Sequence, residues 1–554
     1  MPQYIPKRVM VVVVMVMFLV SILTLNSIGL LSYLAFAQNN NDSNKLIITD
    51  GITSGDVTDN SAIIWSRANA QSLMHVQYDT TASFSYAKPS KTLLVNKSTD
   101  FAGQIKLDSL FPDTLYYYRV WFSLASDNVN TTNSSKGSLS LLPTSDSMIG
   151  NFRTAPNHLT SSSSSTNNRT ISFVIGGDLG GQNYCRRDGT GGIQGYPIFS
   201  IMQSLSPDFF IFNGDQIYGD NACSANGPAN VTGWKNIEGN FQSVTDKKVN
   251  WNNQTQLQDI YNKHWEYNRA DPNLQNLLHN TSMYSQADDH EVVNDYGGKW
   301  SYWTDSTKNR TGFPNVVKAG IDAFFNFSPI DRNKDEPNRI YRSFHWGKGL
   351  DLFLLDNHSY RSRNDLPDTP QNNKTLLGTE QLDWLEQSLL NSTAAWKVIS
   401  ADVPATIPNC FNKQLGCDNW ATNGTSSTFE KTFTRERSEF LKFLDDHNIK
   451  NVVVVATDVH FPTNILVEDD PNHDGDKLIY HELVSGPLSA IPLKANPLDP
   501  SINATSKYQE NQIFNFGYIK IQKQRSDGKV HLISEIRDED GLLRPGSNWD
   551  ISPQ

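Results

Sequence analysis

The sequence is poor in cysteine and has fewer basic than acidic residues. It has four cysteines in 554 residues, too few for a disulfide framework to hold the whole chain together. Lysine and arginine number 47 against 58 aspartates and glutamates, which gives a formal net charge of −11. This balance argues against a nucleic-acid coat protein, because such proteins neutralise phosphates with basic side chains. It leaves phosphate chemistry open, since bound metal cations supply positive charge of their own.

The first 37 residues form a targeting segment. Lys7 and Arg8 precede an apolar run that begins at Val9, and Ala35-Phe36-Ala37 forms a small-x-small cleavage site. The segment is either a cleaved signal peptide or a membrane anchor, because the run is long enough to span a bilayer. Both alternatives place the body of the protein outside the cell, secreted or at the cell surface.

Sequons and cysteine pairs agree with an extracellular location. Asn-x-Ser/Thr sequons for glycosylation recur along the chain, although its composition also produces them by chance. Cys410 and Cys417 close a short loop and are expected to form a disulfide. Cys185 either pairs with Cys223, joining two loops, or acts as a metal ligand.

Two domains are predicted after the targeting segment. Residues 45–155 alternate apolar and polar side chains between turn residues, which is typical of an immunoglobulin- or fibronectin-like β-sandwich. The serine-rich stretch at 156–170 predicts a flexible linker. In residues 171–545 strand-like runs alternate with helical patterns, which predicts an α/β domain with a mostly parallel sheet.

Candidate metal ligands follow four strand-like runs of the second domain. Open α/β sheets bind ligands beyond the carboxyl ends of their strands, so these side chains are expected to meet at one edge. Their order along the chain is that of a two-metal phosphoesterase centre. The residues are Asp178, then Asp215 with Tyr218, then Asp289 with His290, and finally Asp458 with His460.

The residue types suit this chemistry. Asp215 has two oxygens with which it can bridge two ions, and its neighbour Gly214 allows a sharp turn. A phenolate from Tyr218 would be a good ligand for Fe³⁺, and the alternative is a buried structural tyrosine. His290 would donate a proton or stabilise charge beside the phosphate. The alternative for its segment, Asp288-Asp289-His290-Glu291, is an acidic surface loop.

A further strand-like run ends at Asp356 and is followed by Arg361. Asp356 is a candidate ligand, and the planar guanidinium of Arg361 suits a phosphate oxygen. Either side chain is alternatively part of a structural ion pair. The remaining candidates lack such a context and are interpreted as structural or surface histidines: His264, His345, His358, His473 and His481.

These residues, in this order, resemble the PhoD-like alkaline phosphatase/phosphodiesterase family of metallophosphoesterases. The resemblance covers nearly the whole chain after the targeting segment. It is carried by blocks such as PDFFIFNGDQIYGD, YSQADDHEVVNDYGG, LDLFLLDNHSYRS and VVVVATDVHFP. It implies an immunoglobulin-like domain followed by a four-layer α/β/β/α metallophosphoesterase domain.

The resemblance also implies the metals and the roles of the ligands. The family's centre holds Fe³⁺ beside Ca²⁺, so Tyr218 is expected on iron and Asp215 between the two ions. His290 and Arg361 would face the substrate phosphate. The remaining coordination is expected from Asp289, Asp356, Asp458 and His460.

Two positions depart from the family pattern. Family members often carry cysteine where this chain has Asp178, and the aspartate is closer to the GDxG motif of purple acid phosphatases. Harder oxygen ligation leaves Ca²⁺, Mn²⁺ and Zn²⁺ open as the second metal. Asn357-His358 replaces an expected Thr-Arg, so one phosphate-binding arginine is missing.

The sequence therefore predicts a secreted or surface-anchored hydrolase of phosphate monoesters or diesters that acts on small-molecule or lipid substrates. A phospholipase D-like or nucleotide phosphodiesterase is the alternative within this class. A cell-surface binding protein without catalysis is the alternative from another class. The oligomeric state is left open.

Overall fold

The computed structural model describes residues 45–89, 91–124, 144–157, 169–298, 311–410, 416–422 and 431–554. The targeting segment, most of the serine-rich linker and the sequons at Asn41, Asn130, Asn133, Asn168, Asn309 and Asn423 lie outside these ranges. Within them, every helix is too short or too polar to cross a bilayer.

The N-terminal strands enclose a core of their own. They are β1 (Ile48–Gly55), β2 (Ser61–Ala68), β3 (Ser72–Asp79), β4 (Lys91–Val95), β5 (Ala102–Asp108), β6 (Leu115–Ser123) and β7 (Met148–Arg153). Met74, Val76, Tyr118 and Phe122 from β3 and β6 pack against Ile64 from β2. The Phe111 backbone N–H donates to the Tyr116 hydroxyl over 2.9 Å, which is the contact of a tyrosine corner.

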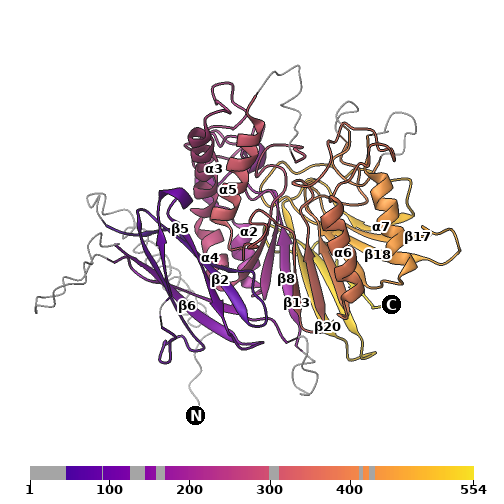
Figure 1. Cartoon of the computed structure of the whole chain (residues 1–554), viewed down its shortest axis with the longest axis horizontal. Coiled ribbons are helices and arrows are strands. Elements are labelled where there is room, and N and C mark those ends of the chain that lie inside the picture. The colour runs from indigo at the N-terminus through magenta and orange to yellow at the C-terminus, as the bar shows by residue number, and fades with distance from the viewer. Residues whose placement is uncertain are drawn as a thin grey trace, which may run out of the picture.

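These strands are not a separate module, because three of them continue the main sheet. Within the described residues one sheet has the order β22-β21-β20-β8-β11-β12-β1-β2-β5, while β4-β3-β6-β7 form another. β1 runs parallel to β12, with Gly55 opposite Met283. The expected sandwich thus shares a sheet with the α/β domain (Figure 1, indigo and violet strands).

The centre of the long sheet is parallel. β8, β11 and β12 run in one direction, and β20 joins β8 antiparallel. β8 and β11 are largely apolar, as is typical of strands that are buried on both faces. The remaining strands of this sheet are β8 (Ile171–Gly176), β11 (Phe209–Asn213), β12 (Ser282–Gln286), β20 (Asn515–Lys523), β21 (Val530–Asp538) and β22 (Trp549–Ile551).

A second large sheet has the order β13-β14-β15-β16-β18-β17-β19. Its middle strands β14, β15, β16 and β18 are parallel. The bounds are β13 (Arg342–Trp346), β14 (Leu350–Leu354), β15 (Trp396–Ser400), β16 (Val452–Ala456), β17 (Thr463–Asp469), β18 (Leu478–Val484) and β19 (Ala504–Gln509). A short hairpin joins β9 (Arg187–Asp188) and β10 (Gln194–Gly195).

Apolar side chains fill the space between the two large sheets. Phe173 and Phe209 from one sheet pack with Leu352, Val398 and Val453 from the other. The shared core fixes the two sheets against each other, so the carboxyl ends of their parallel strands come to lie near one another.

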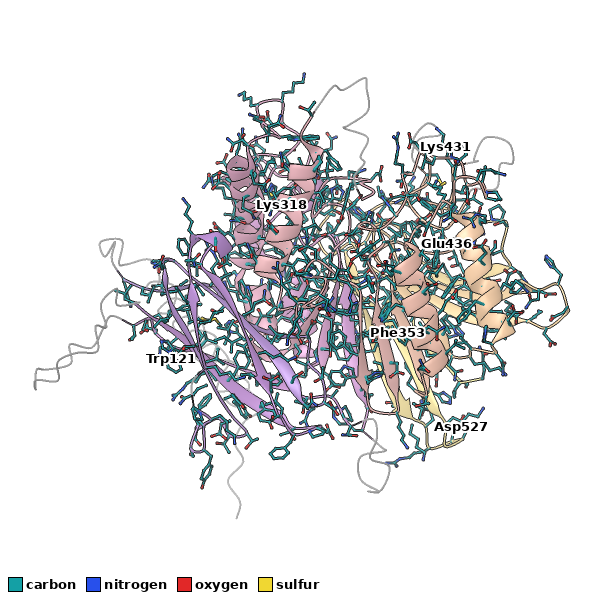
Figure 2. All side chains as sticks on the ribbon, in the orientation of Figure 1. Trp121, Lys318, Phe353, Lys431, Glu436 and Asp527 are labelled. Carbon is teal, nitrogen blue, oxygen red and sulfur yellow. A yellow bond between two sulfur atoms is a disulfide. The ribbon has the colours of Figure 1, made fainter. Side chains whose placement is uncertain are left out.

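Helices cover the outer faces. α2 (Ile198–Ser204) and α4 (Pro272–Asn280) pack on the long sheet. α6 (Thr379–Asn391) and α7 (Thr434–Asp446) pack on the second sheet, where Phe353 of β14 contacts the helix layer (Figures 1 and 2). α3 (Gln254–Arg269) and α5 (Phe313–Phe327) pack on each other and around Trp65 of β2.

Candidate metal centre

Four of the predicted ligands have a left-handed backbone just after a strand. The angle φ is 59° at Asp178, 47° at Asp215, 69° at Asp458 and 58° at His460. Residues other than glycine rarely adopt this conformation, although aspartate and histidine tolerate it better than most. Such positions cluster at functional sites, where the surrounding structure holds them. The turn after β16 explains how Asp458 and His460 approach the same neighbour, Asp178.

The first group of ligand atoms combines both sheets. Asp178, Asp215 and His460 each place a ligand atom within 4.8 Å of the others. The Tyr218 hydroxyl lies 3.0 Å from His460 Nε2. His460 Nδ1 lies 2.7 Å from the Ile491 carbonyl, to which it must donate. His460 Nε2 therefore carries the lone pair with which this side chain could bind a metal ion, in the orientation that a neighbouring carbonyl commonly imposes on a metal-binding histidine.

A second group shares Asp215 with the first. Asp215, Asp289 and His290 also place ligand atoms within 4.8 Å of one another. His290 Nδ1 lies 2.6 Å from Asp220 Oδ1. Burial alone would lower the pKa of His290, but the charges of Asp220, Asp289 and Asp215 raise it well above its usual value. The carboxylate of Asp220 orients this imidazole and favours its protonated form.

The buried carboxylates fit metal ions. Burial raises the pKa of Asp178, Asp215 and Asp458 well above the usual range, and neighbouring carboxylates add to the shift. Asp178 Oδ2 and Asp288 Oδ2 are buried and accept no hydrogen bond from the described residues. Uncompensated buried charge is costly unless it coordinates a metal or pairs with a cation. The donor set of oxygens, one phenol and an imidazole suits hard or borderline cations.

Glu291 holds the loops that carry these ligands. Its carboxylate accepts the backbone N–H groups of Asp215 over 3.1 Å, Gln216 over 2.6 Å and Asp288 over 2.8 Å. Burial raises the pKa of Glu291 to about 8. The segment at 288–291 is therefore buried in the structure, and the alternative of an acidic surface loop is wrong.

His358 lies inside the carboxylate cluster, which the sequence did not predict. Its Nε2 is 2.8 Å from Asp288 Oδ1 and 3.2 Å from Asp402 Oδ2. Asp402 lies two residues beyond the end of β15 and has neither a glycine nor a histidine beside it, so its immediate neighbours did not mark it as a site residue. His358 did carry a signal, because Asp356-Asn357-His358 repeats the spacing of Asp458-Val459-His460.

Asp356 and Arg361 are both buried. Asp356 Oδ1 accepts the Ser359 N–H over 2.9 Å, while its Oδ2 accepts no hydrogen bond from the described residues. Arg361 Nη1 and Nη2 donate to the backbone carbonyl and the carboxylate of Asp418, and Nη2 also donates to the Tyr296 carbonyl. Asp356 thus has one oxygen that could bind a metal ion. Contact between Arg361 and a phosphate stays a prediction.

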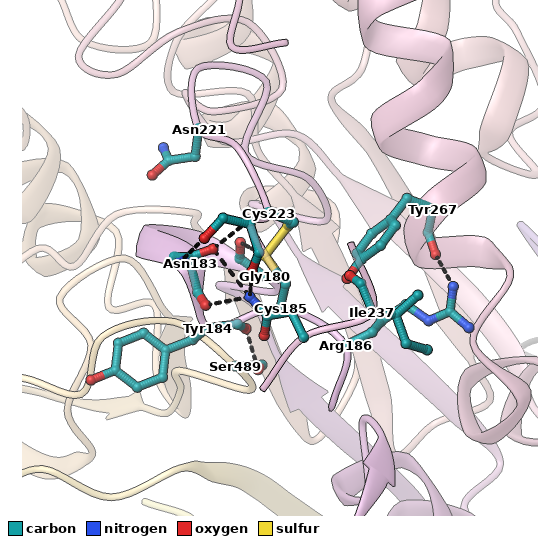
Figure 3. Close-up of a disulfide and its surroundings, with 12 residues drawn as sticks. Gly180, Asn183, Tyr184, Cys185, Arg186, Asn221, Cys223, Ile237, Tyr267 and Ser489 are labelled. Atoms are coloured by element: carbon teal, nitrogen blue, oxygen red, sulfur yellow. Dashed lines mark hydrogen bonds between the residues drawn. A yellow bond between two sulfur atoms is a disulfide. The ribbon is translucent and has the colours of Figure 1, made fainter. Parts of the chain in front are cut away.

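Both predicted disulfides are present beside the site. Cys410 pairs with Cys417, and Cys185 with Cys223, with Cα–Cα distances of 4.1 Å and 5.9 Å. The alternative that made Cys185 a metal ligand is therefore wrong. The Cys185–Cys223 bond fastens the loop after Asp178 to the loop after Tyr218, and the neighbouring Tyr184 ring points away from it (Figure 3). Disulfides of this kind fit an oxidising compartment.

Comparison with known proteins identifies the family of this chain. A family model described as PhoD-like phosphatase matches residues 174–532, and one for its N-terminal domain matches residues 35–156. The alkaline phosphatase D of Bacillus subtilis (strain 168) is 24% identical over 505 residues, covering 85% of this chain and 75% of that protein. A solved structure of PhoD has the same fold, with a TM-score of 0.65, 19% identity and coverage of 90% of this chain and 92% of that one.

The match to the family model and the similarity to alkaline phosphatase D show a phosphoric ester hydrolase, and the acidic and histidine clusters are groups that could hold metal ions. Since the first family model covers more than half of its length, the chain belongs to the PhoD-like phosphatase family.

Proposed function

We propose that the protein hydrolyses small-molecule or lipid phosphate esters outside the cell, secreted or anchored by its N-terminal segment, at a centre of two metal ions. The observation that carries the proposal is that Asp215 lies in both groups, with Asp178 and His460 in one and with the carboxylate of Asp289 in the other. A carboxylate with two oxygens in that position can bridge two ions. The four-layer α/β/β/α arrangement of the family is part of the same proposal, supported by the helix, sheet, sheet and helix cores.

The ligands divide between two sites. Asp178, Tyr218 and His460 would hold Fe³⁺, with Asp215 between the ions. The second ion would be Ca²⁺, Mn²⁺ or Zn²⁺, and its ligands would come from Asp289, Asp356 and Asp458. The metals would supply Lewis acidity and an activated water.

His290 would assist departure of the alcohol. Its Nδ1 is fixed by Asp220, and its other ring nitrogen, Nε2, lies 3.7 Å from Asp289 Oδ1. A charged imidazole held there is suited to protonate a leaving oxygen as the ester bond breaks. Arg361 would hold Asp418 in position. Where the phosphate reaches its guanidinium, Arg361 would also offset negative charge on the phosphate oxygens.

The choice between monoesters and diesters belongs to the same proposal. The residue in place of the expected family arginine, His358, is 1% exposed and lies between Asp288 and Asp402. The imidazole of His358 therefore contacts two carboxylates and does not replace the arginine as a phosphate-binding group. One phosphate-binding cation fewer leaves room for a second ester substituent, which supports activity on diesters such as phospholipids or nucleotides.

The experiment is hydrolysis of p-nitrophenyl phosphate and bis-p-nitrophenyl phosphate by the protein with its native metals and by Asp215→Asn. We expect a loss of activity of at least about 1,000-fold in the variant and a lower metal content, because one bridging charge is gone. Asp351→Asn is the matched control, since Asp351 is equally buried but lies at the other end of β14. Unchanged metal content in Asp215→Asn would contradict the proposal, and the ratio of the two rates tells monoesterase from diesterase.

A further inference from the structure

A cavity of about 540 Å³ adjoins the metal centre. Its lining includes residues from the loop after β18, from the turn after β16 and from positions next to Cys185 and Cys410. The lining side chains used below are Tyr184, Asn409, Val459, Ile491, Leu493 and Gln512.

The cavity wall is bonded directly to the candidate ligands. Asn409 Nδ2 donates to Asp458 Oδ2 over 2.7 Å, and Val459 lies between the ligands Asp458 and His460. The Ile491 carbonyl accepts from His460 Nδ1, and the Leu493 N–H donates to the His460 carbonyl over 2.9 Å. A group bound in this cavity would therefore lie next to whatever the centre holds.

One wall is a supported aromatic ring. The Tyr184 ring lies edge-on to Trp234 at 5.2 Å and to Phe514 at 5.8 Å between ring centroids. The Arg187 guanidinium lies 3.9 Å from the centre of the Trp234 ring. The Tyr184 backbone carbonyl accepts from Ser489 Oγ over 2.6 Å, and Cys185 of the disulfide follows (Figure 3). The ring is thus held from behind.

The other lining residues combine apolar and polar side chains. Ile491 is 37% exposed although it is a large aliphatic side chain, and Pro492 and Leu493 beside it are half-buried. Gln512 supplies an amide that can both donate and accept hydrogen bonds, and Lys494 adds an ammonium group at the exposed rim. A lining that combines an aromatic ring, aliphatic side chains and amides suits a flat heteroaromatic group.

We propose that this cavity binds the organic substituent of the phosphate ester and favours a heteroaromatic substituent of nucleoside size. The inference deepens the proposed function, on which it rests, by naming the substrate class. The phosphate would occupy the metal centre while the nucleobase lies against Tyr184 and Ile491. Phosphate esters of small aliphatic alcohols, such as glycerol phosphate, would not make the contacts with Tyr184 and Ile491.

The test compares adenosine 5′-monophosphate with glycerol 3-phosphate as substrates of the metal-loaded protein. We expect kcat/KM to favour the nucleotide, and Tyr184→Ala and Ile491→Ser each to reduce that preference about tenfold, the value of one aromatic contact. Both variants should lose more kcat/KM for the nucleotide than for glycerol 3-phosphate, and their metal content is measured to check that the centre is intact. Tyr86→Ala, at a tyrosine that is 85% exposed and far along the chain in the β3–β4 connection, is the matched control.

Calorimetric binding of adenosine separates this inference from the proposed function. Tyr184-dependent binding without any ester hydrolysis would support the cavity as a nucleoside site and refute the phosphoesterase proposal. Equal kcat/KM for both esters in the unaltered protein, or equal losses for both in Tyr184→Ala and Ile491→Ser, would overturn the inference.

Discussion

At the scale of single residues, burial decides what a charged side chain does. Arg361 has the planar guanidinium expected of a phosphate contact, yet its side chain is fully buried against Asp418. Asn364 Nδ2 donates to the same carboxylate over 2.8 Å. The pair is therefore part of the scaffold that shapes the centre, whatever else Arg361 contacts when substrate is bound.

We expect Arg361→Met to lower the free energy of unfolding by about 3–5 kcal/mol, because it leaves the buried carboxylate of Asp418 without its cation. Urea unfolding measures this difference. Arg363→Met is the control, since Arg363 is half exposed in its ion pair with Asp365 and should change stability by less than about 1 kcal/mol. A variant of unchanged stability but much higher KM would show that Arg361 acts on substrate instead.

At the scale of elements, the parallel pairing of β1 with β12 joins the two halves of the protein. Gly55, at the end of β1, faces Met283 in that pairing. A Cβ added there would meet Pro329 Cγ at 2.4 Å and the Met283 carbonyl oxygen at 2.7 Å. Two backbones and a proline approach so closely that only glycine fits.

Gly55→Ala is expected to destabilise the whole protein by about 1–3 kcal/mol, the usual cost of overpacking. Gly517→Ala in β20 of the same sheet is the matched control, because its nearest neighbour would be at an ordinary 3.4 Å. The midpoint of thermal unfolding, followed by circular dichroism, gives both values. Loss of only the N-terminal strands in Gly55→Ala, with the remaining transition unmoved, would show that the two halves fold independently.

Local sequence patterns predicted the strands that carry the candidate metal ligands. They did not predict how the N-terminal strands join the sheet of the α/β domain. The apolar runs before Asp178, Asp215, Asp356 and Asp458 predicted β8, β11, β14 and β16, because buried parallel strands have this composition. The junction of β1 with β12 depends on partners more than 200 residues apart, for which the local pattern carries no information. Asp402 was missed because the order of strands within a sheet decides which loops meet: β14 and β15 are neighbouring parallel strands, with Leu354 opposite Ser400, and this brings Asp402 to His358.

At the scale of the whole molecule, buried histidines make the fold sensitive to acid. Burial lowers the pKa of His264, His279 and His481 to about 4. The unfolded chain, with a histidine pKa near 6.5, binds more protons than the folded protein between these values. These histidines therefore remove stability as the pH falls from about 6.5 towards 4.

His264→Gln should make the loss of stability between pH 7.5 and pH 5 smaller by about 2 kcal/mol than in the unaltered protein. His264 is 4% exposed, with its Nε2 3.1 Å from the Gln242 carbonyl oxygen, which glutamine can also reach as a donor. His473→Gln, at an exposed histidine, serves as control. Denaturant unfolding at the two pH values measures the free energy of unfolding of each protein. Equal losses of stability in the variant and the unaltered protein would contradict the lowered pKa of His264.

The left-handed turn at Asp178 also limits how this centre can change over generations. A lineage that exchanges the aspartate for cysteine moves to a residue that tolerates this backbone less well, at a cost of about 1–2 kcal/mol. This exchange is tolerated mainly in a protein whose free energy of unfolding exceeds what folding requires, or after a neighbouring substitution has relaxed the turn. Asparagine loses far less stability in this left-handed conformation. Substitutions at position 178 are therefore expected to keep an oxygen donor and to avoid sulfur.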